Sequence, residues 1–387
     1  MFGNNIYKYI LLEGNMKIVE AISDSNIGGA GRVLLNRLSA QNEYSTSTTV
    51  LLPRGSELIK GLKENSIDYI EINGCHDRSF DFFAIFEFMN ILRDISPDVI
   101  NCHGCLSCRI AAFICGIPVR IYTKHCVFPL KKIEKNRLVR LLTGTSQLIL
   151  SHHIIAVASA AKENLIEVGC DEKKITVIIN GVEPIMKINT EERLRVREIL
   201  NIPKESIVVG IFARIEEYKG HMDFLNAANI LVKKDPSFRF LIVGKGSLYD
   251  DIRSSCEKMG LGDHVIFTGF IYDVGRYLNI TDINVNCSYG TETSSLSLSE
   301  GMSLGIPCVV SEYGGNPHMV ENGKNGFTYP IHDSAYLAEK IFLLSHNKTL
   351  YQKMSENAFC KYKSELNAKE MSRQTYALYE RLVSRLK

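Results

Sequence analysis

Apolar and polar stretches alternate along the first half of the chain in a way that predicts strands separated by helices. Short runs rich in β-branched residues predict strands, and longer runs with helical spacing predict the helices between them. The predicted strands lie at residues 17–23, 47–52, 67–72, 99–102 and 119–123. This alternation is typical of a parallel sheet with helices on both faces.

The stretch from Asn284 to Val310 predicts a compact strand, loop, helix and strand, with Glu292 in the loop and Glu300 in the helix. Ligands of open parallel sheets bind at the carboxyl ends of strands, and a helix that starts there offers unpaired N–H groups to phosphate. Eight helical steps span about 12 Å, too far for a cooperating pair of carboxylates. We therefore expect each glutamate to bind a separate part of one hydroxyl-rich ligand. In the alternative, both are solvated polar residues.

The spacing from Glu292 to Glu300, with residues 301–310 and the Gly314-Gly315-Asn316-Pro317 segment that follow, resembles the signature of family 4 retaining glycosyltransferases. The resemblance extends over almost the whole chain. It implies the α/β fold called GT-B, in which two doubly wound, Rossmann-like parallel-sheet domains face a central cleft. Two residues depart from the pattern: Thr293 replaces a usual glycine and His318 a usual glutamate. Both departures are expected beside the donor site, where they affect the choice of sugar.

On this resemblance the chain divides into three parts. The first domain, on the acceptor side, is expected at residues 16–183 and ends after an Asn180-Gly181-Val182 segment that recurs at this point in the family. The second domain, at residues 190–365, is expected to bind the nucleotide sugar. Residues 366–387 are expected to form a helix that packs back on the first domain.

Two cations follow a predicted strand of the second domain at residues 207–213. Arg214 and Lys219 could neutralise a diphosphate leaving group, since Arg offers a planar fork of donors and Lys a point charge. Their spacing matches the diphosphate-binding pair of the family. The resemblance also implies that the backbone of Ser295 and Leu296 holds the diphosphate and that Glu300 holds the ribose.

The remaining site residues are carried by the resemblance as well. Glu292 and His103 are expected at the sugar, and the loop that begins with Phe270 and Ile271 at the nucleotide base. Gly28 and Gly29, in a loop after the first strand, can let backbone N–H groups approach a ligand closely, although a tight turn without a ligand is the alternative. The loop lacks the glycine spacing of a dinucleotide site. His125, just after the predicted strand at residues 119–123, is expected on the acceptor side.

Composition narrows the partners. The formal net charge is +2 over 387 residues, which gives no support for a nucleic-acid partner. Eleven cysteines, an odd number in apolar segments, indicate reduced thiols in a cytoplasm. Cys102, Cys105 and Cys108 have a spacing that a metal could use, but small buried hydrophobes are the favoured interpretation. We expect no cofactor and no metal, because the fixed cations serve the diphosphate and no Asp-x-Asp motif is present.

A basic segment at residues 131–140, interleaved with apolar residues, indicates a helix on an anionic membrane surface, or else an ordinary solvated helix face. The sequence contains no apolar run long enough to span a bilayer and no signal pattern at residues 1–15. We therefore expect a cytoplasmic enzyme, peripheral on the inner membrane face. It would move a sugar from a nucleoside diphosphate sugar, a UDP-sugar, to a hydroxyl of a lipid-linked acceptor. A nucleotide-sugar epimerase and a non-catalytic subunit are the alternatives.

Overall fold

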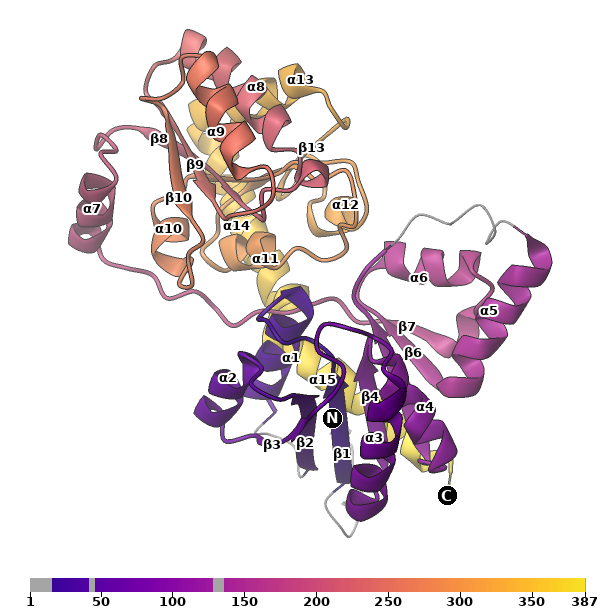
Figure 1. The fold of residues 1–387 in the computed structure, drawn as a ribbon. Helices are drawn as coiled ribbons and strands as arrows, with labels where there is room; N and C mark the ends of the chain where they lie inside the picture. Colours follow the sequence, from indigo (N-terminus) through magenta and orange to yellow (C-terminus); the bar gives the residue numbers. More distant parts are fainter. Residues whose placement is uncertain (1–15, 42–45, 128–135, 387) are drawn as a thin grey trace, which may run out of the picture.

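The computed structural model describes residues 16–41, 46–127 and 136–386. These residues form two α/β domains, drawn in indigo to magenta and in rose to orange, with the last helix in yellow against the first domain (Figure 1). Each domain contains one fully parallel sheet with helices on its faces, which confirms the predicted fold class. No helix within the described ranges is long and apolar enough to cross a membrane. The expectation for residues 1–15 falls outside them.

The sheet of the first domain has seven strands in the order β3-β2-β1-β4-β5-β6-β7. Its strands are β1 (Met16–Ile22), β2 (Thr46–Pro53), β3 (Asp68–Ile72), β4 (Val99–His103), β5 (Val119–Lys124), β6 (His153–Ala156) and β7 (Ile175–Val177). Its helices are α1 (Gly29–Ser39), α2 (Leu58–Glu64), α3 (Phe82–Ile95), α4 (Leu106–Ile114), α5 (Arg137–Leu150), α6 (Ser159–Glu167) and the 3-10 turn η2 (Glu172–Lys174). The glycines expected in a loop after β1 are partly helical: Gly28 is the N-cap of α1, which begins at Gly29.

The sheet of the second domain has six strands in the order β10-β9-β8-β11-β12-β13. Its strands are β8 (Ile207–Phe212), β9 (Phe238–Val243), β10 (Val265–Gly269), β11 (Ile283–Asn286), β12 (Cys308–Ser311) and β13 (Gly326–Tyr329). The helices up to β13 are α7 (Thr190–Ile199), η3 (Glu217–Lys219), α8 (His221–Lys234), α9 (Tyr249–Lys258), α10 (Gly275–Asn279), α11 (Leu296–Ser303) and α12 (Asn316–Met319). The chain then continues through α13 (Ser334–His346), α14 (Lys348–Lys361), the π-helical turn η4 (Tyr362–Leu366) and α15 (Ala368–Ser384).

Each sheet has one point where the strand order reverses, between β1 and β4 in the first domain and between β8 and β11 in the second. Neighbouring loops diverge at such a point and leave room for a ligand at the carboxyl ends of the strands. In the first domain these loops carry the residues after Ile22 and His103, which pair in register. In the second they carry Arg214 and Lys219 after β8 and Glu292 after β11. The topology therefore gathers most of the predicted site residues at two switch points.

Two crossing segments join the domains. Val182 leaves the first domain and forms a parallel bridge with Asn367, where the chain returns. The Val182 N–H donates to Leu366 O at 3.0 Å, and the Ala368 N–H donates to Val182 O at 3.0 Å. A Cβ on Gly181 would lie 2.2 Å from Asn367 O, so this close approach requires glycine. The returning chain places α15 on the first domain, where Met371, Tyr376 and Tyr379 join its core.

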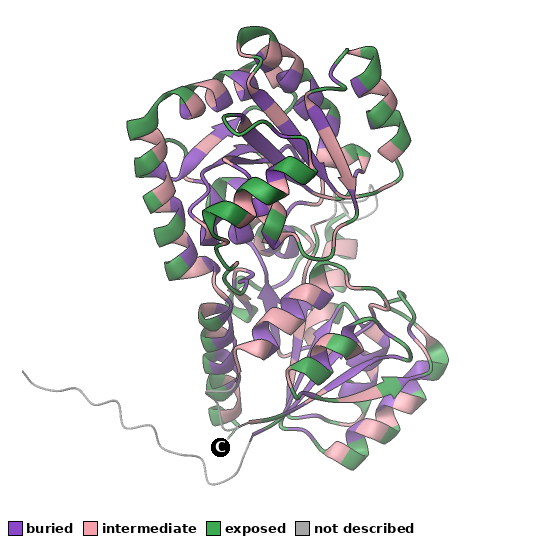
Figure 2. Cartoon of the chain, turned by 90° about the vertical axis from the view of Figure 1, so that its left-hand side faces the viewer, coloured by how far each residue is buried: buried purple, intermediate pink, exposed green. Residues whose placement is uncertain are grey.

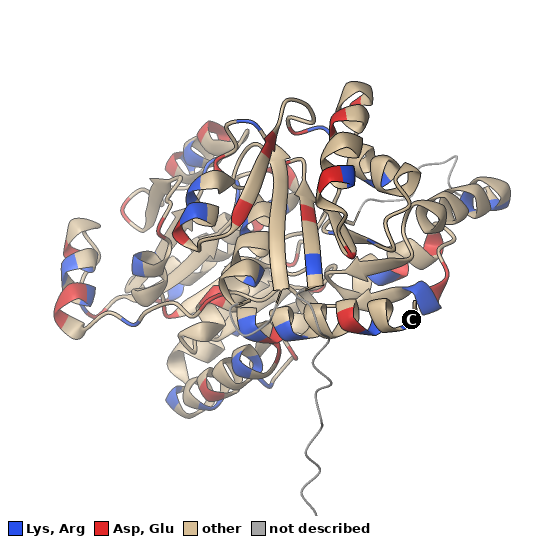
Figure 3. Ribbon diagram, turned by 90° about the horizontal axis from the view of Figure 1, so that it is seen from below, with Lys and Arg blue, Asp and Glu red and all other residues tan. Residues whose placement is uncertain are grey.

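The strands of both sheets are buried while the helices expose their outer faces, shown in purple and green (Figure 2). The surface charge is mixed: Lys and Arg lie among Asp and Glu over much of the molecule (Figure 3). This distribution agrees with the small net charge of +2.

Candidate functional site

The loops after β8 and β11 meet in an ion pair. Lys219, at the end of η3, donates to Glu292 Oε2 at 2.8 Å, and the Glu292 side chain is almost fully buried. Asn286 Nδ2 and Ser288 Oγ donate to the same oxygen at 3.2 and 2.8 Å. Burial alone would raise the pKa of Glu292, but the charge of Lys219 and these three hydrogen bonds outweigh it and lower the pKa. Glu292 is therefore a carboxylate, whose Oε1 makes no hydrogen bond among the described residues.

Gly314 and Gly315 hold the loop that carries Glu292. A Cβ on Gly314 would lie 2.2 Å from Glu292 O, and one on Gly315 would lie 1.4 Å from Thr293 O. Thr291 adopts a positive φ of 54°, which is uncommon for a residue with a branched side chain. The diglycine segment thus lets the backbone after β12 press against residues 292 and 293, which fixes the place of the carboxylate.

Glu300 lies on α11 and pairs with Arg32 on α1, across the domain interface. The Glu300 side chain is 5% exposed and that of Arg32 is 39% exposed. Burial raises the pKa of Glu300, and the nearby Arg32 only partly opposes this rise. The two predicted glutamates therefore differ in environment, and since both are buried, the alternative that both are solvated is wrong.

His103 and His125 lie together at the end of β4 and just after β5. His103 Nδ1 is 2.8 Å from His125 Nε2, and the rings stack with centroids 5.1 Å apart. His103 Nε2 is 2.8 Å from Glu20 Oε2, so both of its ring nitrogens have protein partners. His103 is 5% exposed, whereas His125 is only partly buried. His125 is thus the outer member of the pair.

The two domains touch at the predicted site. Thr293 Oγ1 in the second domain donates to the His125 carbonyl of the first at 3.1 Å. Burial raises the pKa of the Cys126 thiol, while the positive charges of Arg214 and Lys219 lower it. These two cations of the second domain therefore lie close to Cys126 of the first. The structure therefore brings Glu292, Lys219, Arg214 and the histidine pair to one interdomain region.

The other predicted site residues differ in exposure and in contacts. Arg214 is exposed and its side chain makes no ion pair or hydrogen bond within the described part of the chain. Phe270 is 70% exposed just after β10, so its ring is accessible to a flat ligand, and Ile271 beside it is partly buried. A Cβ on Gly29 would meet open space, as a ligand-facing glycine should. The Ser295 N–H contacts Met319 Sδ at 3.2 Å, and Leu296 opens α11.

The two departures from the family pattern have different positions. Thr293 touches His125, beside the predicted sugar position. His318, expected near the donor, instead faces Glu365 in η4, with 3.8 Å between Nε2 and Oε2. Lys361 also pairs with Glu365, so His318 belongs to the region where the chain returns to the first domain. The expected effect of His318 on the choice of sugar stays a prediction.

Cys102, Cys105 and Cys108 are free and buried, together with Cys75, in the core between the sheet and α3 and α4. Burial raises the pKa of the Cys108 thiol well above its usual range, which disfavours the thiolate that binds metals. No group of three ligating side chains is arranged to hold a metal ion among the described residues. These cysteines pack as small hydrophobes.

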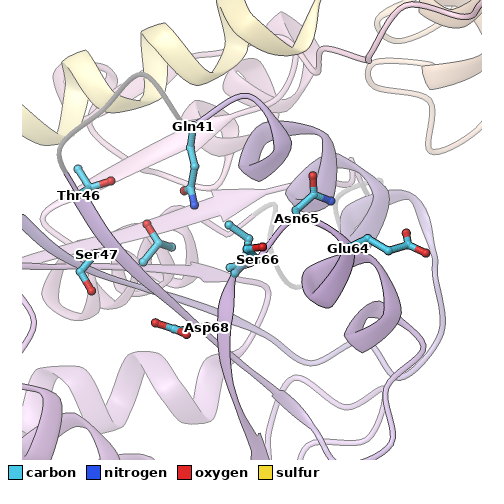
Figure 4. Close-up of a pocket in the computed structure, with 9 residues that line it drawn as sticks. Gln41, Thr46, Ser47, Glu64, Asn65, Ser66 and Asp68 are labelled. Atoms are coloured by element: carbon cyan, nitrogen blue, oxygen red, sulfur yellow. The ribbon is translucent and has the colours of Figure 1, made fainter.

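A cavity of about 550 Å³ lies elsewhere in the first domain (Figure 4). It opens where β2 and β3 begin, at the opposite end of the strands from the switch-point loops. Its lining is polar and includes Gln41, Thr46, Ser47, Glu64, Asn65, Ser66 and Asp68. None of the predicted site residues lines it, and the chemistry of the switch points therefore outweighs its size as a guide to function.

Comparison with known proteins agrees with this geometry. Residues 192–360 match the family model described as glycosyl transferases group 1, and residues 27–184 match that of glycosyltransferase family 4. Together the two models extend over both domains. This chain belongs to the family 4 glycosyltransferases. It has the GT-B fold, as the solved structure of Alr3699/HepE from Anabaena shows: that structure has a TM-score of 0.81 and 20% identity, with 95% of this chain and 100% of that chain covered.

Curated relatives of this glycosyltransferase include two bacterial proteins. The putative glycosyltransferase EpsD of Bacillus subtilis is 28% identical over 184 residues, and the match spans 48% of each chain. The UDP-Gal:alpha-D-GlcNAc-diphosphoundecaprenol alpha-1,3-galactosyltransferase of Escherichia coli is 27% identical over 285 residues, 70% of this chain and 72% of that one. The match to EpsD thus covers about half of that relative's length.

Sequence reasoning missed several residues at the interdomain region. Arg32 and Glu20 make the contacts described above, and the buried Ser294 hydroxyl has no partner among the described residues. Asp24, after β1, lies close enough to His103 for the two side chains to interact electrostatically. The sequence offered one signal for these residues: Glu20 stands within the apolar first strand, and a charge buried in such a strand requires a partner.

Proposed function

We propose that this glycosyltransferase moves a sugar from a UDP-sugar to a hydroxyl of a lipid-linked acceptor, with retention at the anomeric carbon. The observation that carries the proposal is the ion pair between Lys219 and Glu292 at the start of α11. It places a cation for the leaving diphosphate next to a carboxylate whose Oε1 can accept from a sugar hydroxyl. Two relatives support the donor: the Escherichia coli protein is a UDP-Gal transferase, and the Anabaena structure contains UDP and glucose.

Retention is supported by the way Glu292 is held. Three donors converge on its Oε2, and they stabilise the carboxylate as a fixed hydrogen-bond acceptor rather than as an attacking nucleophile. In the proposed reaction the leaving diphosphate receives the acceptor's proton, while Arg214 and Lys219 stabilise its charge. These two cations also support a reaction that needs no metal ion. The acceptor and the linkage would be set on the acceptor side, where we place His125.

The deciding assay is release of UDP that depends on an added acceptor, with the anomeric configuration of the product read by NMR. Glu300→Gln should mainly raise KM for the donor, because a ribose contact is equal in the ground and transition states. Glu292→Gln should mainly lower kcat, because the sugar carries charge only in the transition state. Epimerised nucleotide sugar without transfer would show an epimerase instead. The absence of any turnover with a bound donor would favour a binding subunit.

We further propose that the first domain lies on an anionic membrane surface through α5. Residues 131–135 of the predicted basic segment fall outside the described ranges, but Arg137 and Arg140 are on α5. Leu138, Leu141 and Leu142 on this helix are each more than 60% exposed, at helical spacing. Exposed leucines beside arginines suit the interface of an anionic bilayer.

Co-sedimentation with anionic and neutral vesicles tests this attachment. The wild type should bind anionic vesicles and be released by salt, as charge attraction is screened within a Debye length. Leu141→Ser with Leu142→Ser should weaken binding, and Leu343→Ser, at an exposed leucine on α13, is the matched control. Equal binding to both vesicle types would contradict the proposal.

A further inference from the structure

Glu20 is a fully buried carboxylate at the centre of the first sheet, and it is the inner end of a chain of polar contacts that reaches the interdomain region. Its Oε1 lies 2.5 Å from Arg37 Nη2 and accepts from the Tyr379 hydroxyl at 2.9 Å. Its Oε2 lies 2.8 Å from His103 Nε2. His103 in turn contacts His125 through Nδ1, so one polar chain runs from Glu20 to His125.

Strand register places these groups on one face of the sheet. Glu20 pairs with Asn101 on β4, and His103 lies two residues further along the same strand. Asn101 Nδ2 donates to the Tyr379 hydroxyl at 3.0 Å, so α15 is tied to the same cluster. Arg37 comes from α1. The cluster therefore joins side chains from four elements, β1, α1, β4 and α15, and the last two are distant from β1 in sequence.

The proton positions follow from hydrogen-bond chemistry. Burial opposes the charge of Glu20, but Arg37, His103 and Tyr379 together lower its pKa, so Glu20 is an ionised acceptor. His103 Nε2 must then carry a proton. Burial, and to a lesser degree His103, holds the pKa of His125 well below its usual range, so His125 carries one ring proton. The single contact between the two rings decides which nitrogen of His125 has it.

Two arrangements satisfy this contact. When His103 is neutral, its Nδ1 accepts from His125 Nε2–H, and His125 Nδ1 is an acceptor. When His103 is cationic, its Nδ1–H donates to His125 Nε2, and His125 Nδ1 carries the proton. The change balances: one proton binds at His125 Nδ1, another passes from His125 Nε2 to His103 Nδ1, and the new positive charge lies beside Glu20.

We propose that Glu20 is a positioning residue that, through His103, sets whether His125 Nδ1 offers a hydrogen-bond acceptor or a donor to the interdomain site. The use of that nitrogen rests on the proposed function, in which a hydroxyl-rich sugar or acceptor lies next to His125. A hydroxyl can both donate and accept, but a fixed acceptor orients it in one way only. Glu20 thereby controls the orientation of a substrate hydroxyl without touching it.

Other charged groups face the same histidines and belong to the test. Asp24 after β1 acts on His103, and Arg214 and Lys219 act on Cys126, next to His125. Tyr379 on α15 and Arg37 on α1 face Glu20. None of these groups bridges the two rings among the described contacts, so the hydrogen bond between His103 and His125 decides the tautomer.

The test is nitrogen NMR of the full chain labelled at histidine, which needs neither donor nor acceptor. The proposal predicts both histidines protonated at Nε2 above the titration of His103. Below it, the proton of His125 should move to Nδ1 with the same midpoint. His153 contacts Thr176 at 2.8 Å outside this cluster and is the internal control. Separate midpoints for His103 and His125, or a His125 protonated at Nδ1 throughout, would overturn the proposal.

Variants separate positioning from folding. Glu20→Gln should remove the charged acceptor that fixes the proton on His103 Nε2 and leave His125 as a mixture of tautomers. If that variant does not fold, Tyr379→Phe keeps the carboxylate and should shift the signals of both rings together while His153 stays unchanged. Tyr351→Phe, which removes a hydroxyl bonded to Asp282 O in the second domain, should shift neither. Unchanged ring signals in Tyr379→Phe would contradict the proposal, whatever the transferase assay shows.

If the proposed function also holds, kcat/KM should change with the midpoint measured by NMR, and Glu20→Gln should move that limb of the pH profile. Suppose that NMR shows the coupled proton shift while the pH profile of kcat/KM does not follow it. That result would refute the use of His125 Nδ1 by the substrate. A missing transferase activity would refute the proposed function and leave the NMR result intact. The two failures are therefore distinguishable.

Discussion

Lys219 donates to Glu292 across 2.8 Å, so the cation proposed for the leaving diphosphate is already paired with the carboxylate proposed for the sugar. Both charged side chains are largely buried, next to the loop that leads into α11. Each depends on the other: an unpaired Glu292 would be a buried charge without compensation. The pair therefore links stability to activity, in contrast to Arg214, which is exposed.

Lys219→Met should lower both stability and turnover. Loss of the partner of a buried carboxylate costs about 3 kcal/mol of unfolding free energy, and loss of a charge-assisted contact to the diphosphate costs about 10- to 100-fold in kcat. Arg214→Gln should lower kcat with little change in stability. Denaturant unfolding and donor-saturated kinetics measure both effects. Adding Glu292→Gln to Lys219→Met should recover part of the stability. Equal unfolding free energies for Lys219→Met and Arg214→Gln would show that the ion pair does not contribute to stability.

Thr293→Val should weaken the contact between the domains. The substitution keeps the shape of the side chain but removes the hydroxyl that donates to the His125 carbonyl, which is worth about 1 kcal/mol. Thr293→Ser keeps the hydroxyl and is the matched control. We expect a several-fold loss of kcat/KM in the valine variant and near wild-type activity in the serine variant. A reversed order would mean that the methyl group, rather than the hydrogen bond, is what this position supplies.

Gly315→Ala should displace the loop that carries Glu292. Its φ of −84° suits any residue, so the effect comes from space alone: the new Cβ would lie 1.4 Å from Thr293 O. Overpacking of this kind costs about 1–3 kcal/mol, and kcat should fall as the carboxylate moves. Gly262→Ala, where a Cβ meets nothing within 4 Å, is the control and should behave like the wild type. An active, fully stable Gly315→Ala protein would refute the role of the diglycine segment.

The buried His221 should make the free energy of unfolding decrease as the pH is lowered. It is 2% exposed at the start of α8, and burial, with the charge of Lys219, lowers its pKa to about 4. An unfolded histidine titrates near 6.5, so between pH 6.5 and 4 the unfolded state binds more protons and the free energy of unfolding decreases as pH falls. By pH 4 this amounts to about 3 kcal/mol. His221→Leu should flatten the unfolding free energy over this range, while His76→Gln, at an exposed position, should not. The same slope in both variants would assign the pH dependence to other histidines.

The sequence alone determined the fold class and the ends of strands where chemistry gathers. Local apolar periodicity specifies strands and helices, and alternation of the two leaves a parallel sheet as the way to bury them. Loops after strands then carry Lys219 and Glu292 to one edge. The motif spacing identified the family for the same reason, since it lies within one strand, loop, helix and strand unit.

Only the tertiary structure decided which groups pair. Arg32 meets Glu300 from a position 268 residues away, and Tyr379 meets Glu20 across 359 residues. Local propensity says nothing of such pairs, because they depend on how α1, α11 and α15 pack once both domains have formed. The same packing turned His318 toward η4 and made His125, rather than His103, the outer ring of the pair. Side-chain direction and strand register fix these contacts, and both exist only in the folded chain.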